Sequence, residues 1–275
     1  MTDGGSLASG WRPSGFLRAS VGLHAAGAAA LFLEPRRWPL VVGGLVLDHA
    51  LIAAATVQPC SRLLGPNLRR LEGADARAAA ARHEVALTFD DGPDPEVTPA
   101  VLEILERRGA RATFFCIGRR VSACPEIARE AHRRGHAVEN HTFSHPYAFG
   151  FYGRAAMERE VGGAQDAIAS ATGRAPRLFR APVGIRNPGL DPVLARLDLR
   201  LVSWTRRGLD TMRADSRRVA ARLRRGLAPG DVLLLHDGSS ARDSRGAAVV
   251  LDALERVLDG LEEAGLRSVA IPSGG

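Results

Sequence analysis

The 275 residues are enough for one large domain or two small ones, and a core of this size is readily stable. The net charge of +7 arises from arginine alone, because the 37 basic residues include no lysine, and we attribute this to the composition of the source genome. No basic and aromatic residues alternate as in nucleic-acid-binding proteins, so nucleic-acid binding is not expected. The odd number of cysteines (Cys60, Cys116 and Cys124) and their spacing argue against a disulfide framework or a zinc–thiolate site.

The N-terminal part contains two apolar stretches, residues 19–33 and 38–58. The second is long enough to cross a bilayer as a helix, and the first becomes so if it includes residues from Ser14 onward. We therefore expect residues 16–58 to form a helical hairpin that anchors the protein in a bacterial cytoplasmic membrane. A cleaved signal peptide is disfavoured, because no small-x-small cleavage site follows Leu33. A helical pair buried against the rest of the protein remains an alternative.

Asp48 and His49 interrupt the middle of the second apolar stretch. A charged side chain at the centre of a membrane helix costs about 2.5–3.5 kcal/mol on insertion scales. We therefore expect the pair to face the first helix, a partner chain or water. The simplest arrangement is a polar contact within the hairpin, for instance with His24. We assign the remaining histidines outside the motifs below to structural or surface positions.

The rest of the chain alternates apolar runs with amphipathic patterns, after a short N-terminal tail (1–15), the hairpin and an arginine- and alanine-rich linker (59–82). The alternation predicts a catalytic domain over residues 83–275. Its predicted strands are 85–89, 111–117, 136–140, 177–180, 199–204, 231–236 and 268–271. Its predicted helices are 98–108, 125–134, 153–172, 188–197, 216–226 and 247–265. Together they predict an α/β fold, a distorted and incompletely closed barrel of about seven strands.

Two short segments carry the residues of a metal site. Asp90 and Asp91 follow the apolar run 85–89 and precede a Gly-Pro turn, so both are expected at the carboxyl end of a strand, where α/β folds place active sites. His141 and His145 are spaced so that one helical turn would present both rings on one face. Two histidines and one aspartate would give three ligands and an open position for water. Each segment taken alone is equally compatible with a solvated turn or a histidine-capped loop.

Three further segments follow in order, each near the end of an apolar run: Arg180 to Gly184, Trp204 with Asp210, and Leu234 to His236. With these five motifs, residues 83 to 272 resemble the polysaccharide deacetylases that contain a NodB homology domain, carbohydrate esterase family four. The resemblance implies the partly closed barrel of that family. It also implies a divalent metal, most simply Zn²⁺, with Co²⁺ or Mn²⁺ as alternatives.

The resemblance implies a role for each matching residue. Asp90 corresponds to the catalytic base, and Arg180 to the arginine that holds it. The metal ligands correspond to Asp91, His141 and His145. His236 corresponds to the general acid and Asp210 to the carboxylate that orients it. On the substrate side, the resemblance implies an oxyanion donor in the backbone N–H of Val183, an acyl-pocket wall in Leu234, and a further pocket residue in Trp204.

Three positions depart from the family pattern. Val183 stands where an aromatic residue is usual, Thr211 where a tryptophan is usual, and Glu139 where a glycine is usual. The two missing aromatic side chains bear on sugar stacking, so the resemblance supports the reaction better than it supports a long polymeric glycan as substrate. Val183 keeps its backbone N–H, so the implied oxyanion role is unaffected.

The expected function is metal-dependent removal of an N-acetyl group from an amino sugar of a glycan such as peptidoglycan or a chitin oligosaccharide. One alternative is a deformylase or deacetylase of a lipid-linked sugar precursor, which the hairpin and the missing aromatic residues favour. Another is a glycan-binding protein without turnover, which the complete set of catalytic residues disfavours. The family resemblance places the catalytic domain outside the cytoplasm, although the arginines flanking the hairpin weakly favour the opposite orientation.

Overall fold

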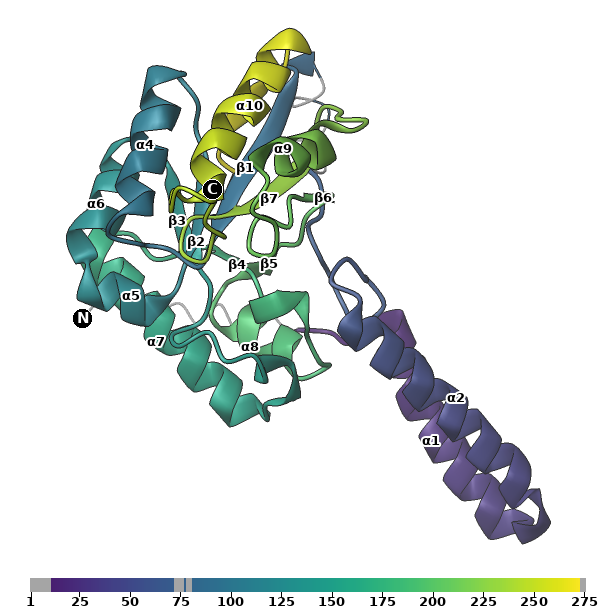
Figure 1. Cartoon of the computed structure of the whole chain (residues 1–275). Coiled ribbons are helices and arrows are strands. Elements are labelled where there is room, and N and C mark those ends of the chain that lie inside the picture. Colours follow the sequence, from purple (N-terminus) through teal and green to yellow (C-terminus); the bar gives the residue numbers. More distant parts are fainter. Residues whose placement is uncertain (1–10, 72–76, 78–80, 273–275) are drawn as a thin grey trace.

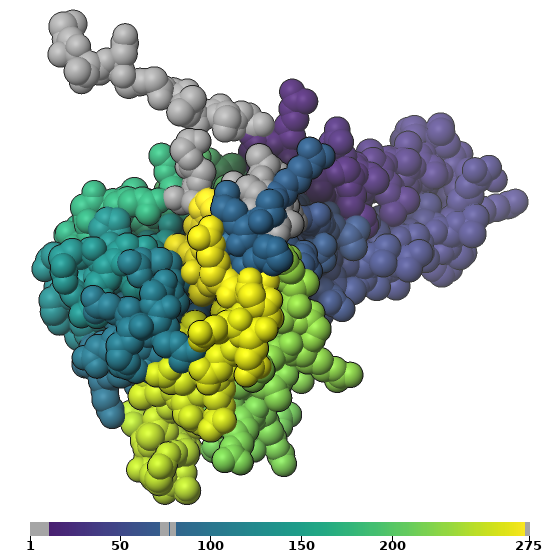
Figure 2. All heavy atoms as spheres, turned by 90° about the horizontal axis from the view of Figure 1, so that it is seen from above, coloured from purple at the N-terminus to yellow at the C-terminus, as the bar shows by residue number. Residues whose placement is uncertain are grey.

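The computed structural model describes residues 11–71, 77 and 81–272. Figure 1 shows an α/β body from which two long helices project side by side, and Figure 2 shows the same helical pair standing clear of the body. The predicted N-terminal tail lies mainly outside the described residues, as does a part of the predicted linker, at 72–76 and 78–80.

The projecting pair is the predicted hairpin. Helix α1 (Gly15–Leu33) and helix α2 (Trp38–Val57) are joined by the short 3₁₀ helix η1 (Pro35–Arg37). Ser14 caps α1 by accepting a hydrogen bond from the N–H of Leu17 (3.2 Å), so the first apolar stretch does extend toward Ser14. Both helices are long and apolar enough to cross a membrane, with mean hydropathy of 1.5 and 2.0. Only 11% of the apolar stretch of each helix is buried. The alternative of a pair buried against the body is therefore wrong.

The body is built on one parallel sheet, curled into an incomplete barrel. Its strands lie in the order β5-β4-β3-β2-β1-β7-β6. The last strand, β8, pairs with residues 84–86 at the start of β1, whereas β2 pairs with residues 88–90 at its end. The strands are β1 (Glu84–Asp90), β2 (Thr113–Cys116), β3 (Ala137–Asn140), β4 (Leu178–Phe179), β5 (Arg200–Leu201), β6 (Arg206–Arg207), β7 (Val232–His236) and β8 (Arg267–Val269). The predicted fold class is confirmed, and β6 is a short strand that the sequence analysis did not predict.

Helices cover the sheet as the amphipathic patterns predict. They are α4 (Val97–Arg107), α5 (Gly118–Ala123), α6 (Pro125–Arg133), α7 (Arg154–Thr172), α8 (Leu190–Arg196), α9 (Ser216–Arg224) and α10 (Val249–Glu263), of which α5 was not predicted. In α10, for example, Val250, Leu254, Val257 and Leu261 recur at helical spacing and are buried. The helix α7 ends at Gly173, whose φ of 74° is the left-handed conformation that favours glycine at a helix end.

Strand β1 lies in the middle of the sheet and positions the site. All seven of its residues are buried, because β2 and β7 flank it and the helices cover it. A strand that is buried on both faces has a nearly continuous apolar sequence. Residues 85–89 therefore do not alternate between apolar and polar side chains. The apolar run ends at Asp90, so the side-chain carboxylate of Asp90 lies at the C-terminal edge of the sheet.

The segment after α2 packs along the body. Leu68 forms a parallel bridge with Val202, and the buried Arg186 guanidinium donates hydrogen bonds to the carbonyls of Ser61 (3.0 Å), Gly65 (3.0 Å) and Pro66 (3.1 Å). Because these bonds join a buried side chain of the body to three carbonyls of this segment, they fix the start of the body relative to the base of the hairpin.

Candidate active site

The adjacent carboxylates of Asp90 and Asp91 line the same cavity. Neighbouring side chains on a strand point to opposite faces, but Asp91 lies just beyond β1 with a φ of 71°, and this left-handed conformation turns the chain. The cavity has a volume of about 360 Å³ and both aspartates contribute to its wall. The expectation that the turn brings both carboxylates to one place is therefore confirmed.

His141 and His145 reach this cavity from a loop after β3, not from a helical turn. Thr142 and His145 have φ values of 65° and 55°, which an α-helix does not permit. The Asn140 side chain accepts a hydrogen bond from the N–H of Thr142 (2.9 Å), and the Thr142 hydroxyl accepts one from the N–H of His145 (3.1 Å). These local bonds fold the loop, and the two imidazole rings lie 4.9 Å apart. The helical interpretation was wrong because these side-chain bonds replace the helical ones.

Asp91, His141 and His145 have the geometry of a divalent-metal site. The Nε2 atoms of His141 and His145 lie 3.4 and 3.3 Å from Asp91 Oδ1, and one ligand atom from each residue lies within 4.8 Å of the others. Asp91 Oδ1 is buried without a hydrogen-bond partner. His141 donates from Nδ1 to the carbonyl of Arg180 (2.8 Å), which leaves Nε2 free as a ligand. The residues present therefore fit a small divalent ion with nitrogen and oxygen ligands.

The electrostatics agree with this arrangement. Burial tends to raise the pKa of Asp91, but the neighbouring imidazoles of His141, His236 and His145 outweigh it and lower the pKa far below its usual value. Asp91 is therefore ionised at neutral pH, as a metal ligand must be.

Arg180 holds Asp90 in place. The guanidinium donates from Nη1 to Asp90 Oδ1 (2.6 Å) and to the Thr88 hydroxyl (2.9 Å), and from Nη2 to the carbonyl of Ser203 (3.1 Å). It also lies over the Phe115 ring, 4.1 Å from the centroid. Arg180 is only 1% exposed, so removing it would leave the buried Asp90 charge without its partner.

His236 is oriented by Asp210. One oxygen of Asp210 accepts the backbone N–H of His236 (2.7 Å), and the other accepts a hydrogen bond from ring Nδ1 (3.0 Å). Since a carboxylate only accepts, Nδ1 carries a proton and Nε2 is the atom that remains for chemistry. Burial tends to lower the pKa of His236, but the hydrogen bond and negative charge of Asp210 outweigh it and raise the pKa above its usual value.

Val183, Trp204 and Leu234 line the cavity at the positions that the motifs predict. Val183 has a φ of 50°, unusual for a β-branched residue, and strain of this kind costs about 1–3 kcal/mol and concentrates at functional sites. Of the departures from the family pattern, Val183 and Thr211 line the cavity. Glu139 instead lies buried on β3, beside β4, where its Oε2 accepts the N–H groups of Arg177 and Leu178, both at 2.7 Å.

Sequence reasoning missed several residues of the cavity. The Ser239 hydroxyl donates to Asp91 Oδ2, and Arg119, Arg120 and Arg207 contribute to the cavity wall. Ser239 lies three residues after His236, and the Arg119–Arg120 pair is separated from the apolar run 113–117 by Gly118 alone, so proximity to a motif or to a strand end was the available signal. Arg207 lies on β6, the strand that the sequence analysis did not predict, and no local pattern indicated it.

Comparison with known proteins identifies the family. The family model for polysaccharide deacetylase matches residues 77–202. A chitooligosaccharide deacetylase from Azorhizobium caulinodans is 36% identical over 207 residues, which cover 73% of this chain and 98% of that protein. The chain belongs to the polysaccharide deacetylase family, carbohydrate esterase family four.

Further relatives of this deacetylase come from other genera. A peptidoglycan-N-acetylglucosamine deacetylase from Bacillus cereus is 32% identical over 189 residues, covering 68% of this chain and 85% of that protein. Among solved structures, the family 4 carbohydrate esterase from Streptomyces lividans in complex with acetate aligns with a TM-score of 0.63 and 34% identity, over 70% of this chain and 94% of that one. The chain is accordingly a hydrolase of carbon–nitrogen bonds other than peptide bonds.

Proposed function

We propose that this deacetylase removes an N-acetyl group from an amino sugar of a cell-envelope glycan, in a metal-dependent reaction. The observation that carries the proposal is the convergence of one complete set of groups on and directly behind a single cavity: Asp90, Asp91, His141, His145, Arg180, Asp210 and His236. The similarity to chitooligosaccharide and peptidoglycan deacetylases supports this class of substrate.

A divalent ion, most simply Zn²⁺, held by Asp91, His141 and His145 would lower the pKa of a water molecule and polarise the amide carbonyl. Asp90, kept in position by Arg180, takes the proton of the water that attacks the amide carbon. The N–H of Val183 donates to the oxyanion, a contribution of about 10²–10³ in rate for one such donor. His236 then protonates the departing amine, and the products are a free amino sugar and acetate.

The test is an acetate-release assay with the purified full-length chain in detergent, supplied with Zn²⁺, Co²⁺ or Mn²⁺. Acetylated chitin oligomers, peptidoglycan and a lipid-linked acetylated amino sugar serve as substrates. We expect metal-dependent acetate release that Asp90→Asn abolishes. Glycan binding without acetate release from any substrate under any metal would instead support the non-catalytic alternative.

A lipid-linked amino sugar is the second candidate substrate, because the residues that directly follow the hairpin pack against the cavity wall. Pro59 lies two residues after α2, its carbonyl accepts a hydrogen bond from the Ser203 hydroxyl (2.5 Å), and its ring lies so close to Gly184 that a Cβ there would approach it to 2.6 Å. Cys60 donates to the carbonyl of Trp204 (3.1 Å). Since Gly184 and Trp204 line the cavity, a membrane-inserted hairpin would hold the cavity next to the lipid surface.

The charge of the cavity also favours a substrate with an anionic group. Among the described residues, no carboxylate forms an ion pair with Arg119, Arg120 or Arg207 on the cavity wall. Arg207 lies over the Trp204 ring, 5.8 Å from its centroid, and its Nε is buried without a hydrogen-bond partner. A phosphate or carboxylate on the substrate would satisfy these donors.

The matched test compares Arg207→Gln with Arg217→Gln, a change at an exposed arginine of α9 outside the catalytic cavity. For a phosphate-linked amino sugar we expect Arg207→Gln to raise KM about tenfold while leaving kcat for a neutral chitin oligomer unchanged. Equal KM values in the two variants would show that no anionic group contacts Arg207.

We propose that residues 16–58 anchor the protein in the cytoplasmic membrane, after a tail of residues 1–15 and before a linker of residues 59–82, and that the catalytic domain of residues 83–275 lies outside the cytoplasm. Two helices of sufficient length and apolarity support the anchor. Reporter fusions at the C-terminus test the orientation. Activity of a reporter that functions only inside the cell would reverse it and favour a lipid-linked precursor as the substrate.

A further inference from the structure

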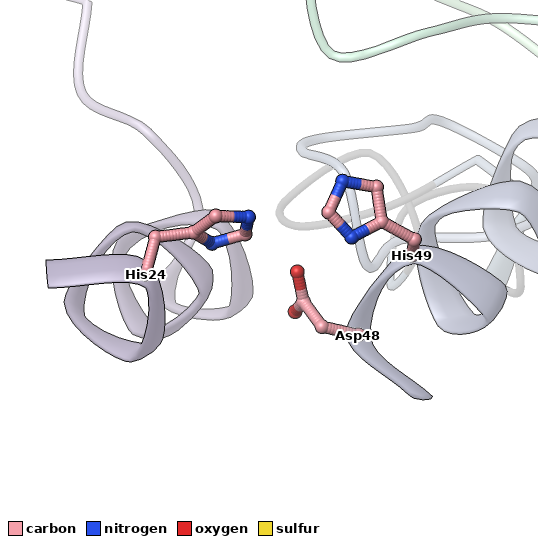
Figure 3. Close-up of side chains that lie close together, drawn as sticks. All are labelled: His24, Asp48 and His49. Carbon is pink, nitrogen blue, oxygen red and sulfur yellow. The ribbon is translucent and has the colours of Figure 1, made fainter. Parts of the chain in front are cut away.

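The N-terminal hairpin contains a second cluster of metal-ligating side chains, away from the deacetylase cavity. His24 extends from α1, and Asp48 and His49 extend from α2 (Figure 3). One ligand atom from each residue lies within 4.8 Å of the others, and the two imidazole rings lie 5.2 Å apart. The set contains two histidines and one aspartate, the same donors as Asp91, His141 and His145.

Both histidines are held in the tautomer that a metal ligand needs. His24 Nδ1 lies 2.8 Å from the carbonyl of Ser20, and His49 Nδ1 lies 2.8 Å from the carbonyl of Leu45. A carbonyl only accepts hydrogen bonds, so each Nδ1 carries the proton and each Nε2 keeps its lone pair. His141 of the catalytic cavity is held by a backbone carbonyl in the same way (2.8 Å), and this is the usual second contact of a metal-binding histidine.

Asp48 is positioned by the opposite helix. The Ser20 hydroxyl of α1 donates to Asp48 Oδ2 (2.7 Å), and Asp48 is only 6% exposed. This bond satisfies one carboxylate oxygen and leaves the other available. The prediction that Asp48 faces the first helix is confirmed, although its hydrogen bond is to Ser20 and not to His24. The remaining oxygen and the two Nε2 atoms supply three ligands.

Close packing of the helices keeps the three residues together. At Gly27 on α1, a Cβ would approach the Val41 side chain of α2 to 2.9 Å, so a larger residue there would force that side chain or the helices to shift. The three residues of η1 fix the register of the two helices. The ligands are therefore arranged before an ion arrives, which reduces the entropy lost on binding.

The hydrogen bond between Ser20 and Asp48 would be enough by itself to join the two helices. It does not explain why two histidines with free Nε2 atoms lie beside Asp48. We propose that His24, Asp48 and His49 bind a divalent transition-metal ion of the Zn²⁺ class, which links α1 to α2. Both histidines are exposed, so the fourth position of a tetrahedral site opens to the outside of the hairpin. This ion is separate from the one proposed for the catalytic cavity.

The test is the metal content of the full-length protein in detergent, measured by mass spectrometry after saturation with Zn²⁺ and removal of the excess. We expect two ions per chain in the wild type and one in His24→Gln/His49→Gln, with deacetylase activity retained. The retained activity shows that the variant is folded. His141→Ala should also contain one ion, but should be inactive. The triple variant should contain none.

A matched control removes two histidines that belong to neither cluster, as His83→Gln/His132→Gln, and should keep two ions. Ser20→Ala should weaken the affinity of the hairpin ion about 10- to 100-fold, the usual effect of losing a group that orients a ligand. One ion per chain in the wild type, or two in His24→Gln/His49→Gln, would overturn the hairpin site without affecting the proposed deacetylase reaction. An unchanged affinity in Ser20→Ala would show that Ser20 does not position a ligand of the hairpin ion and would count against the proposed site.

Discussion

Asp90 and His236 lie directly opposite each other in the register of the parallel strands β1 and β7. Each is the last residue of its strand, so both lie at the carboxyl edge of the sheet. Neighbouring strands of a sheet are about 4.8 Å apart. Different partners hold them, Arg180 in one case and Asp210 in the other. The sheet register thus sets the spacing between the proposed base and acid, and a separate buried ion pair holds each side chain in place.

The two adjacent aspartates should have separable effects on metal content. We expect Asp91→Ala to lose the catalytic ion, because it deletes a ligand whose Oδ1 lies within 3.4 Å of both histidine nitrogens. Asp90→Asn should keep the ion and lose activity, because Asp90 is bound by Arg180 and only the base is removed. Equal depletion of metal in both variants, measured on samples with intact circular dichroism spectra, would contradict the assignment.

The size of the leaving acyl group should be limited by Leu234. This side chain is buried and lines the cavity, so acetyl or formyl amides should be hydrolysed and longer chains rejected by overpacking. We expect kcat/KM for a butyryl amide to fall at least about tenfold below that for acetyl, and Leu234→Ala to restore part of it. Efficient butyryl hydrolysis by the wild type would refute this limit.

The alkaline limb of the rate against pH should report His236. Asp210 raises the pKa of His236, and the acid must be protonated for the amine to leave, so activity should decline as the pH rises through that raised pKa. In Asp210→Asn the charge is gone, and the limb should move to lower pH with metal content unchanged. His236→Ala should abolish the limb and cost about 10²–10⁴ in kcat. A limb that stays in place in both variants would identify another proton donor.

Glu139 should make the protein less stable at alkaline pH. Burial raises its pKa to about 7, although the N–H groups of Leu178 and Arg177 lower it in part. Because the folded-state pKa exceeds the unfolded one, the stability that Glu139 contributes is present at low pH and is lost as the pH rises through about 7. Glu139→Gln keeps an acceptor for both N–H groups without the buried charge.

We therefore expect Glu139→Gln to raise the free energy of unfolding at pH 8 by about 3 kcal/mol relative to wild type and to change it little near pH 4. Denaturant titration followed by tryptophan fluorescence measures both values. Glu103→Gln, at an exposed position of α4, is the matched control and should be neutral at both pH values. A variant less stable than wild type at pH 8 would show that the ionised carboxylate stabilises β4.

Features governed by neighbouring residues could be predicted from the sequence. The apolar run 85–89 followed by a Gly-Pro turn predicted both the central strand and the carboxylates at its end. The two apolar stretches predicted the hairpin, and amphipathic spacing predicted each of the described helices α4 to α10 except α5. In each case a pattern within a few residues is sufficient to predict the element. The spacing of apolar residues determines which side chains can be buried together, and this spacing is a local property of the sequence.

Features that depend on distant segments were decided only by the tertiary structure. His141 and His145 meet through a loop folded by Asn140 and Thr142, where spacing alone had suggested a helix. Arg207 reaches the cavity because β6 pairs with β7, and Pro59 packs behind the cavity wall because it contacts Gly184, more than a hundred residues away. Side-chain hydrogen bonds and close contacts of this kind join segments far apart in the chain, so no local pattern of residues determines them.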